Sequence, residues 1–198
     1  MDEEPAEAPS ETGAAEAAEP APAAGACALL SAAEVEQLLG GPGSVPTPGQ
    51  SAGVPNCRWS GADGRTLQTI AGGATEWARG LPELVRAIEA SGAVDLDAEE
   101  VEALRRGVEM VEAGQDIEAG AACDLFSEML RVQGEEPGTQ RVVALYPNAD
   151  APLAVSGQAC TDGRFTSVVL LDEGGWEEPP PLELVDAALG SAHRASLR

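Results

Sequence analysis

"GACALLSAAEVEQLLGG" at residues 25–41 contains the start, the body and the end of one short helix. Ser31 and Glu34 form the S-x-x-E pattern of a capping box, which marks a helix N-terminus. Apolar residues then recur at helical spacing as far as Leu39, and two glycines follow. The stretch therefore predicts a short amphipathic helix with a cysteine, Cys27, just ahead of it.

The same organisation occurs again in "CDLFSEMLRVQG", which begins at Cys123. In both stretches a cysteine leads an apolar helix that a glycine ends. A later cysteine then opens a strand and is followed by an Asp-Gly-Arg turn, in "CRWSGADGR" at Cys57 and in "CTDGR" at Cys160. We interpret this pattern as a weak internal duplication in which a helix is stapled to a strand twice.

The duplication favours two local disulfides, Cys27–Cys57 and Cys123–Cys160, although four cysteines allow three pairings. Closing a loop of about 30 residues stabilises a fold by roughly 3 to 4 kcal/mol in the chain-entropy model. Buried free thiols are the alternative. A zinc site is disfavoured because no two cysteines have the short spacing of such sites and because the only histidine is His193. Disulfides would place the domain in an oxidising compartment.

Charge and composition narrow the classes of partner. The formal net charge is −23, all the basic residues are arginine, and aromatic residues make up only 3%. A chain this acidic repels phosphate backbones and anionic membrane surfaces, so we expect no nucleic-acid partner and no membrane contact without an anchor. No phosphate-binding or calcium-binding loop is recognisable, and no cofactor is expected.

Residues 1–26 consist mainly of Ala, Glu and Pro and contain no Leu, Ile, Val or aromatic residue. Such a segment lacks the apolar surface needed to offset the entropy of folding, so it is predicted to be a disordered acidic tether. Residues 27–198 are predicted to be a single disulfide-stapled domain. Met1 is followed by acids and by no apolar run, so this start is not that of a signal peptide. Taken literally it indicates a cytosolic chain, but we give the cysteines more weight.

The rest of the chain is predicted to contain both strands and helices. Residues 42–56 are predicted to be a loop because of their Pro and Gly content. Strands are predicted at 57–72 (two, around a turn), 140–147, 151–160 and 164–173, and helices at 81–90, 98–114, 116–133 and 182–193. Asp162-Gly163 reads as a tight hairpin turn. The predicted fold is α+β, with a twisted, mainly antiparallel sheet and helices packed against it.

Two segments resemble a known family. They are "ACALLSAAEVEQLLGG" with the later "CRW", and "ACTDGRFTSVVLL" at 159–171. The positions that carry the resemblance are Cys27, Leu29, Leu30, Ser31, Glu34, Cys57 and Trp59. They resemble the actinobacterial secreted-lipoprotein family catalogued as domain of unknown function 3558 (DUF3558), over about residues 26–195.

The resemblance implies a signal peptide that is removed, a lipidated cysteine ahead of the tether, and a domain on the outer face of the plasma membrane or in the cell wall. This chain carries no lipobox, and Met1 stands about where the lipidated cysteine would be. No enzymatic activity comes with the resemblance.

Residues suited to catalysis are scarce. His193 is the only side chain whose ordinary pKa lies close to neutrality. A hydrolase that used it would need an acid and a Ser or Thr beside it in a cleft, and the G-x-S-x-G motif is absent. The chain is therefore predicted not to be an enzyme, with a hydrolase using His193 as an alternative.

The three tryptophans differ in the role that their surroundings predict. Trp59, next to Cys57, is expected in the core against the disulfide. Trp77 and Trp176 lie in Gly-rich surroundings beside charged residues and are candidate partner-binding residues. The alternative is that both side chains cover a core that is poor in aromatic residues.

The sequence thus predicts a non-enzymatic, extracytoplasmic lipoprotein domain that binds a cell-envelope protein or a wall or lipid ligand. The ligand would lie in an apolar groove between sheet and helices or against an exposed tryptophan. A different alternative is an acidic inhibitor or immunity-type module, which would bind a basic target in a strongly salt-dependent way.

Overall fold

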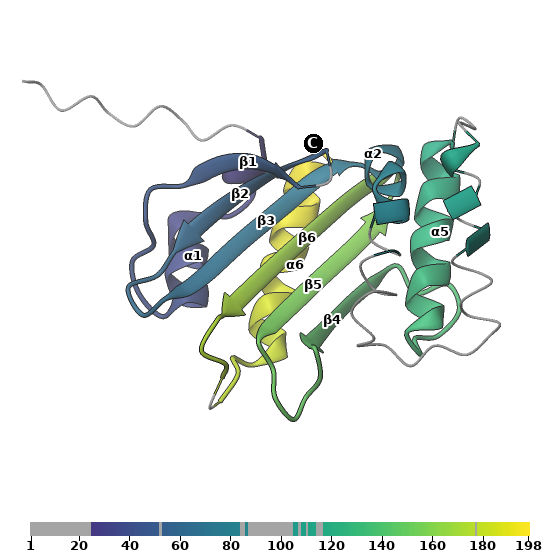
Figure 1. The fold of residues 1–198 in the computed structure, drawn as a ribbon. Coiled ribbons are helices and arrows are strands. Elements are labelled where there is room, and N and C mark those ends of the chain that lie inside the picture. Colours follow the sequence, from purple (N-terminus) through teal and green to yellow (C-terminus); the bar gives the residue numbers. More distant parts are fainter. Residues whose placement is uncertain are drawn as a thin grey trace, which may run out of the picture.

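In the computed structural model the chain forms one six-stranded antiparallel sheet with helices on both faces (Figure 1). The structure describes residues 25–51, 53–83, 86, 105–106, 108–109, 111–113, 117–176 and 178–198. The strands are β1 (Thr47–Ser51), β2 (Val54–Ser60), β3 (Arg65–Gly73), β4 (Arg141–Tyr146), β5 (Ala154–Thr161) and β6 (Arg164–Asp172). The helices are the 3₁₀ turn η1 (Gly25–Ala28), α1 (Ala32–Leu39), α2 (Ala74–Arg79), α5 (Ala119–Val132) and α6 (Leu182–Ser196).

The strand order is β1-β2-β3-β6-β5-β4, and every neighbouring pair is antiparallel. The predicted α+β class with a mainly antiparallel sheet is therefore confirmed. Each half of the chain contributes a helix, three strands and a further helix, in the order α1-β1-β2-β3-α2 and α5-β4-β5-β6-α6. The halves meet at the centre of the sheet, where β3 pairs with β6 over nine residues, from Arg65↔Asp172 to Gly73↔Arg164.

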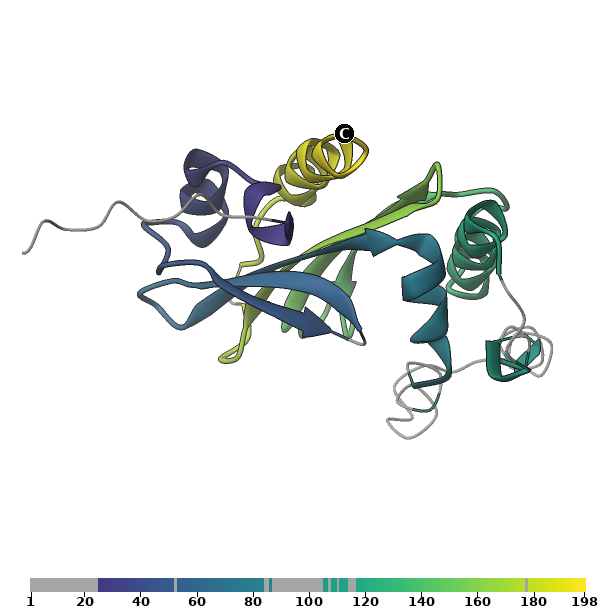
Figure 2. The same ribbon diagram turned by 90° about the horizontal axis from the view of Figure 1, so that it is seen from above.

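Two hydrophobic cores form, one on each face of the sheet. The first core lies under η1, α1 and α6 and includes Trp59, Leu67, Val168 and Leu189. The second lies under α2 and α5 and is built around aromatic residues. Figure 2 shows α1 and α6 on one side of the sheet, and α2 with α5 at one end of it. The second face is therefore only partly covered by the described elements.

The two predicted disulfides are present, and each belongs to a different core. Cys27 in η1 bonds to Cys57 in β2, with 4.9 Å between Cα atoms, inside the first core. Cys123 in α5 bonds to Cys160 in β5, with 5.3 Å between Cα atoms, inside the second. The cysteines lie within strands β2 and β5, whereas the sequence predicted that they open them.

Helix α1 forms as its capping box predicts. The Ser31 hydroxyl accepts a hydrogen bond from the Glu34 backbone N–H at 3.3 Å, and the Ser31 N–H donates to Glu34 Oε2 at 2.8 Å. Gly40 ends the helix with φ +73°, a conformation that glycine adopts without the steric penalty other residues incur. Val35 and Leu39 are buried against the sheet.

The predicted loop at 42–56 is wrong in part, because it contains β1 and the start of β2. Proline and glycine are unfavourable inside a sheet, but β1 lies at its edge, where Pro48 needs no partner on its outer side. Helix α2 was also not predicted. It is only six residues long, so the sequence contains too few turns to show a helical period.

The other strands and helices agree with the sequence to within a few residues. The Asp162-Gly163 turn joins β5 to β6 with φ values of +49° and +72°, as expected for a tight hairpin. Most of the helices predicted at 81–90 and 98–114 lies outside the described residues. No described helix is long and apolar enough to span a membrane.

The predicted tether, 1–26, lies mostly outside the described residues, which begin at Gly25. Ala26 is only 4% exposed, and its carbonyl oxygen accepts a hydrogen bond of 2.7 Å from the Thr69 hydroxyl. Ala26 therefore packs with the domain that was predicted to begin at Cys27.

Candidate functional site

The partly covered face of the sheet carries a cleft of about 220 Å³ beside α2. Its floor is formed by side chains from β3, β5 and β6, and its wall by α2 and the residues that follow it. The lining residues are Ser51, Val54, Ile70, Trp77, Gly80, Leu81, Ser156, Gln158, Phe165, Ser167 and Val169. We call this space the open-face cleft. Its volume is below the usual range for drug-sized ligands, so it fits a small apolar group.

A short row of polar side chains crosses the floor of the open-face cleft. Gln158 lies directly opposite Ser167 in the β5–β6 pairing, and Ser156 lies two residues before Gln158. The Gln158 amide donates to the Ser156 hydroxyl at 3.3 Å. Ser167 is 3% exposed as a whole residue and lines the cleft beside Gln158. The floor of the cleft therefore presents hydroxyl and amide groups with which a ligand can form hydrogen bonds.

Trp77 forms the wall of this cleft and is not an exposed anchor. It is 8% exposed, stacks on Phe165 with 5.2 Å between ring centroids, and meets the edge of Phe126 at 5.5 Å. Of the two possibilities that the sequence left open, the structure has the one in which Trp77 covers the core, and a role of Trp77 in partner binding stays a prediction. One part of the ring still borders the open-face cleft.

Trp176 lies on the loop after β6 and packs, partly buried, against the first core. The Arg65 guanidinium stands over its ring, with Cζ 4.8 Å from the ring centroid. Its indole Nε1 is buried and has no hydrogen-bond partner among the described residues. Trp176 is thus also a packed side chain. The structure places Trp77 and Trp176 in separate cores and does not bring them together.

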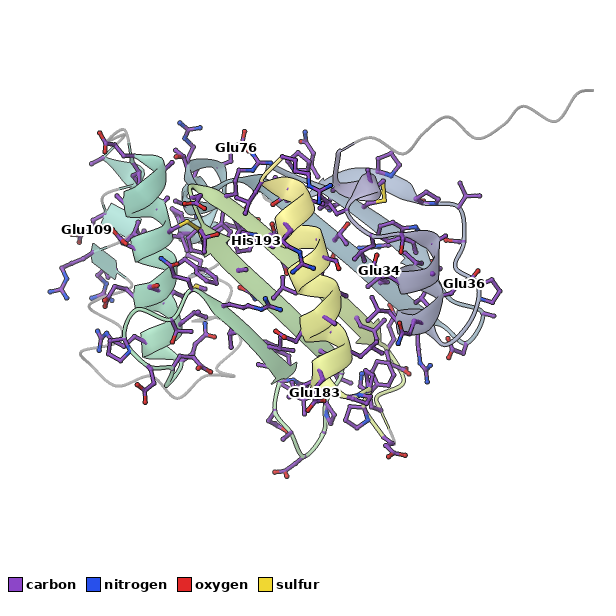
Figure 3. The ribbon with its side chains drawn as sticks, turned by 180° about the vertical axis from the view of Figure 1, so that it is seen from behind. Glu34, Glu36, Glu76, Glu109, Glu183 and His193 are labelled. Atoms are coloured by element: carbon purple, nitrogen blue, oxygen red, sulfur yellow. A yellow bond between two sulfur atoms is a disulfide. The ribbon has the colours of Figure 1, made fainter. Side chains whose placement is uncertain are left out.

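His193 lies between α6 and the sheet, held by hydroxyl groups (Figure 3). Its Nε2 is 2.7 Å from Thr161 Oγ1, and its Nδ1 is 3.0 Å from Thr166 Oγ1. Thr166 Oγ1 is in turn 2.9 Å from Ser196 Oγ. Ser196 Oγ donates to the His193 carbonyl oxygen at 2.8 Å.

This chain of hydrogen bonds fixes the neutral tautomer of His193. Ser196 uses its single proton on a carbonyl oxygen, which can only accept, so it accepts from the Thr166 hydroxyl. Thr166 must then accept from Nδ1–H, and Nε2 accepts from Thr161. Both ring nitrogens are therefore used in attaching the last helix to strands β5 and β6.

The surroundings of His193 disfavour its protonation. Burial lowers the pKa of the imidazole, and the Arg141 and Arg164 charges lower it further, while Asp162 raises it. The hydrolase hypothesis needs a hydroxyl, an acid and a cleft. Threonine hydroxyls lie beside the ring, no carboxylate hydrogen-bonds to it among the described residues, and the open-face cleft is lined by other side chains.

The described residues also offer no cluster of metal ligands. Among the described residues, no three His, Cys, Asp or Glu side chains gather closely enough to hold a metal ion. All four cysteines are used in disulfides.

Comparison with known proteins adds no family assignment. No family model, curated protein or solved structure matches this chain. The resemblance to domain of unknown function 3558 therefore rests on the motif residues alone and stays a prediction.

The residues on the floor of the cleft were not predicted from the sequence. The signal was present in β5, where Val155-Ser156-Gly157-Gln158-Ala159 places polar side chains on one face only. A period of two with polar residues on one side indicates a face that is not fully covered. The sequence does not show that α2 closes one end of that face.

Proposed function

We propose that this protein is a non-enzymatic, extracytoplasmic domain that binds a small, largely apolar group in the open-face cleft. The observation that carries the proposal is the open-face cleft itself, in which apolar and aromatic side chains surround the polar row of Ser156, Gln158 and Ser167. A ligand with an aliphatic or aromatic body and one hydrogen-bonding atom complements this arrangement. A lipid or wall component, or a side chain of an envelope protein, has this chemistry.

Two disulfides support the proposed compartment, because such bonds persist in oxidising environments and are rare in the cytosol. Attachment of the native protein to the outer face of the plasma membrane through an N-terminal lipid, and membership of the lipoprotein family named above, belong to the same proposal. Their support is the motif around Cys27 and the acidic Ala/Pro/Glu composition of residues 1–26.

The two alternatives have weaker support. A hydrolase has only the threonine hydroxyls at His193 in its support, since no carboxylate of a described residue hydrogen-bonds to the ring. An inhibitor or immunity-type module rests on the net charge of −23 alone. It differs from the proposal in a measurable way, because its binding would weaken steeply with salt, whereas binding of an uncharged group in an apolar cleft would not.

The test is an NMR titration of the isotope-labelled protein with neutral probes, n-hexanol and benzyl alcohol. We expect shifts of the Ser156, Gln158 and Ser167 backbone signals and of the Trp77 indole signal. Replacing Ser167→Leu should fill the cleft and abolish these shifts. Ser167→Ala should weaken binding by about three- to tenfold, since one hydrogen bond contributes about 0.5 to 1.5 kcal/mol.

The matched control is Ser60→Leu, the same substitution on an exposed residue of β2 outside the cleft. It should leave binding unchanged. Shifts scattered over the surface, or equal binding by the Ser167→Leu and Ser60→Leu variants, would refute the proposed site.

A further inference from the structure

The two edges of the sheet differ in a way that concerns partner binding. Strand β1 is polar and exposed, and it contains Pro48 and Gly49, which hinder pairing with another strand. Strand β4 reads Arg-Val-Val-Ala-Leu-Tyr, with neither proline nor glycine. Four of its residues, 142–145, are apolar and only partly buried. The sequence of β1 thus protects its edge against the addition of a further strand, whereas the sequence of β4 contains neither of these protecting residues.

The backbone groups on the outer side of β4 can be identified from its pairing with β5. The Cys160 N–H donates to the Gln140 carbonyl oxygen at 2.9 Å, just beyond the Arg141↔Ala159 pair. Because hydrogen-bonded and non-bonded pairs alternate in an antiparallel ladder, the N–H and C=O groups of Arg141, Val143 and Leu145 point away from β5. No described residue forms a backbone hydrogen bond with these outer groups.

A groove of about 530 Å³ runs along this edge, between β4 and the first turns of α6. It is lined by Arg141, Val142, Val143, Leu182, Glu183 and Asp186. Leu182 is 37% exposed, and so is Tyr146 at the end of the strand. The edge therefore combines backbone groups that no described residue occupies, a groove beside them and exposed apolar side chains, which are the elements of a strand-addition site.

Charge decides which strand fits. Arg141 is occupied by Asp186, with Nη2 2.7 Å from Oδ1. Glu183 makes no hydrogen bond or ion pair with a described residue, and Figure 3 shows it at the end of α6 opposite to His193. The chain as a whole carries a net charge of −23, so a second copy of it would be repelled. A basic segment would be attracted.

We propose that β4 binds an extended segment of another protein, in which apolar side chains alternate with Lys or Arg, as a seventh strand of the sheet. Apolar side chains of that segment lie against Val143 and Leu182, and a basic side chain pairs with Glu183. This surface shares no lining residue with the open-face cleft, so the proposal does not depend on the function proposed above.

The probe for this proposal is a synthetic peptide of about eight residues, the length of an ordinary strand, in which valine and lysine alternate. Titrated into the labelled full chain, it should shift the signals of β4 and of the first turn of α6. The Val143 and Leu145 amides should become protected from hydrogen exchange. A peptide that alternates valine with glutamate should not bind.

The decisive variant is Val143→Pro, which removes an outward N–H and leaves the hydrogen bonds to β5 in place. It should abolish peptide binding, whereas Val143→Ala, which keeps the N–H, should not. Glu183→Lys should weaken binding about two- to fivefold, as expected for an exposed ion pair, and Glu36→Lys on α1 should not specifically weaken it. Thermal unfolding of each variant establishes that the fold is intact.

If the Val143→Pro variant does not fold, the comparison of Glu183→Lys with Glu36→Lys decides the question. No binding of the basic peptide at about 1 mM, or shifts away from β4, would overturn the proposal. So would sedimentation of the protein alone as a dimer that Val143→Pro converts to a monomer, because the edge would then belong to a second copy.

Discussion

Cys57 and Cys160 point to opposite faces of the same sheet, although the chain around each cysteine has the same organisation. Cys57 lies in the core under α1 and α6, and Cys160 in the core under α2 and α5. The two disulfides therefore hold two separate packing units. Each unit should depend on its own bond.

This separation predicts additive effects of removing the bonds. Replacing Cys27 and Cys57 with alanine, or Cys123 and Cys160, should each lower the free energy of unfolding by about 3 to 4 kcal/mol, since the loops closed are of similar length. Urea unfolding of both paired variants and of the fourfold variant measures this. A coupling energy above about 1 kcal/mol would mean that the two cores are one cooperative unit in this respect.

Gly163 and Gly64 provide a matched comparison for the packing of α5. Both have positive φ, +72° and +87°, and both lie in turns that join sheet strands. A Cβ on Gly163 would come within 2.6 Å of Ala119 Cβ, whereas a Cβ on Gly64 meets nothing within 4 Å.

Gly64→Ala should therefore cost about 1 to 2 kcal/mol, the penalty for the left-handed conformation alone. Gly163→Ala should cost about 1 to 3 kcal/mol more because of the clash with α5. Chemical denaturation of both variants gives the difference. Equal losses would show that α5 does not rest on the hairpin.

His193 should make stability depend on pH in a defined window. Its pKa is lowered from the ordinary 6.5 by burial and by neighbouring arginines, so below that pH the unfolded chain binds more protons than the folded one. The contribution of His193 to stability is therefore complete above pH 6.5 and declines as pH falls toward the lower, folded pKa.

His193→Gln removes this titration. The difference in unfolding free energy between wild type and His193→Gln should therefore change between pH 7.5 and pH 5.5. The change should favour the variant in acid, because this range includes the ordinary histidine pKa. A difference that does not vary with pH would contradict the lowered pKa.

Glu34 in the capping box of α1 should also make stability depend on pH, in a more acidic range than His193 does. Burial alone would raise the pKa of Glu34, but hydrogen bonds from Ser31 and Ser191 and the Arg194 charge outweigh it, so the pKa is lowered. Figure 3 shows Glu34 on the side of α1 that faces α6. Its contribution to stability is present above its ordinary pKa of 4.5 and is lost as the pH falls through the lower, folded value.

Ser31→Ala should cost about 1 kcal/mol near neutral pH, as expected for the loss of an N-cap. Ser60→Ala, at an exposed residue of β2 whose hydroxyl makes no hydrogen bond to a described residue, serves as the comparison in the same unfolding experiment. Loss of the same size in both variants would indicate that the cap does not stabilise α1.

Much of the secondary structure could be read from local patterns. The capping box at Ser31, the Asp162-Gly163 turn and the apolar spacing of α5 and α6 each depend on residues close together in the chain, and the structure has all of these elements. Strand β1 could not be predicted, because Pro48 is compatible with a strand only at a sheet edge, and which strand forms the edge is a tertiary property.

The candidate sites depend almost wholly on the tertiary structure. The Gly-rich and charged surroundings of Trp77 left open whether it is exposed or covers the core, and the short helix α2 places its ring on Phe165 of a distant strand. Ser156 and Ser167 become one polar row only through the β5–β6 pairing. The free edge of β4 exists because the two halves of the chain join at β3 and β6.

Spacing and residue chemistry along the chain predicted the α+β class, and the internal duplication favoured the two local cysteine pairs among three possible pairings. The pairing of the strands places the two disulfides on opposite faces, and among the described elements it leaves part of one face and the outer side of β4 uncovered. Side-chain direction alternates along a strand, so Cys160 enters the second core while its neighbour Ala159 enters the first, and the core that a cysteine joins depends on its exact position in the strand.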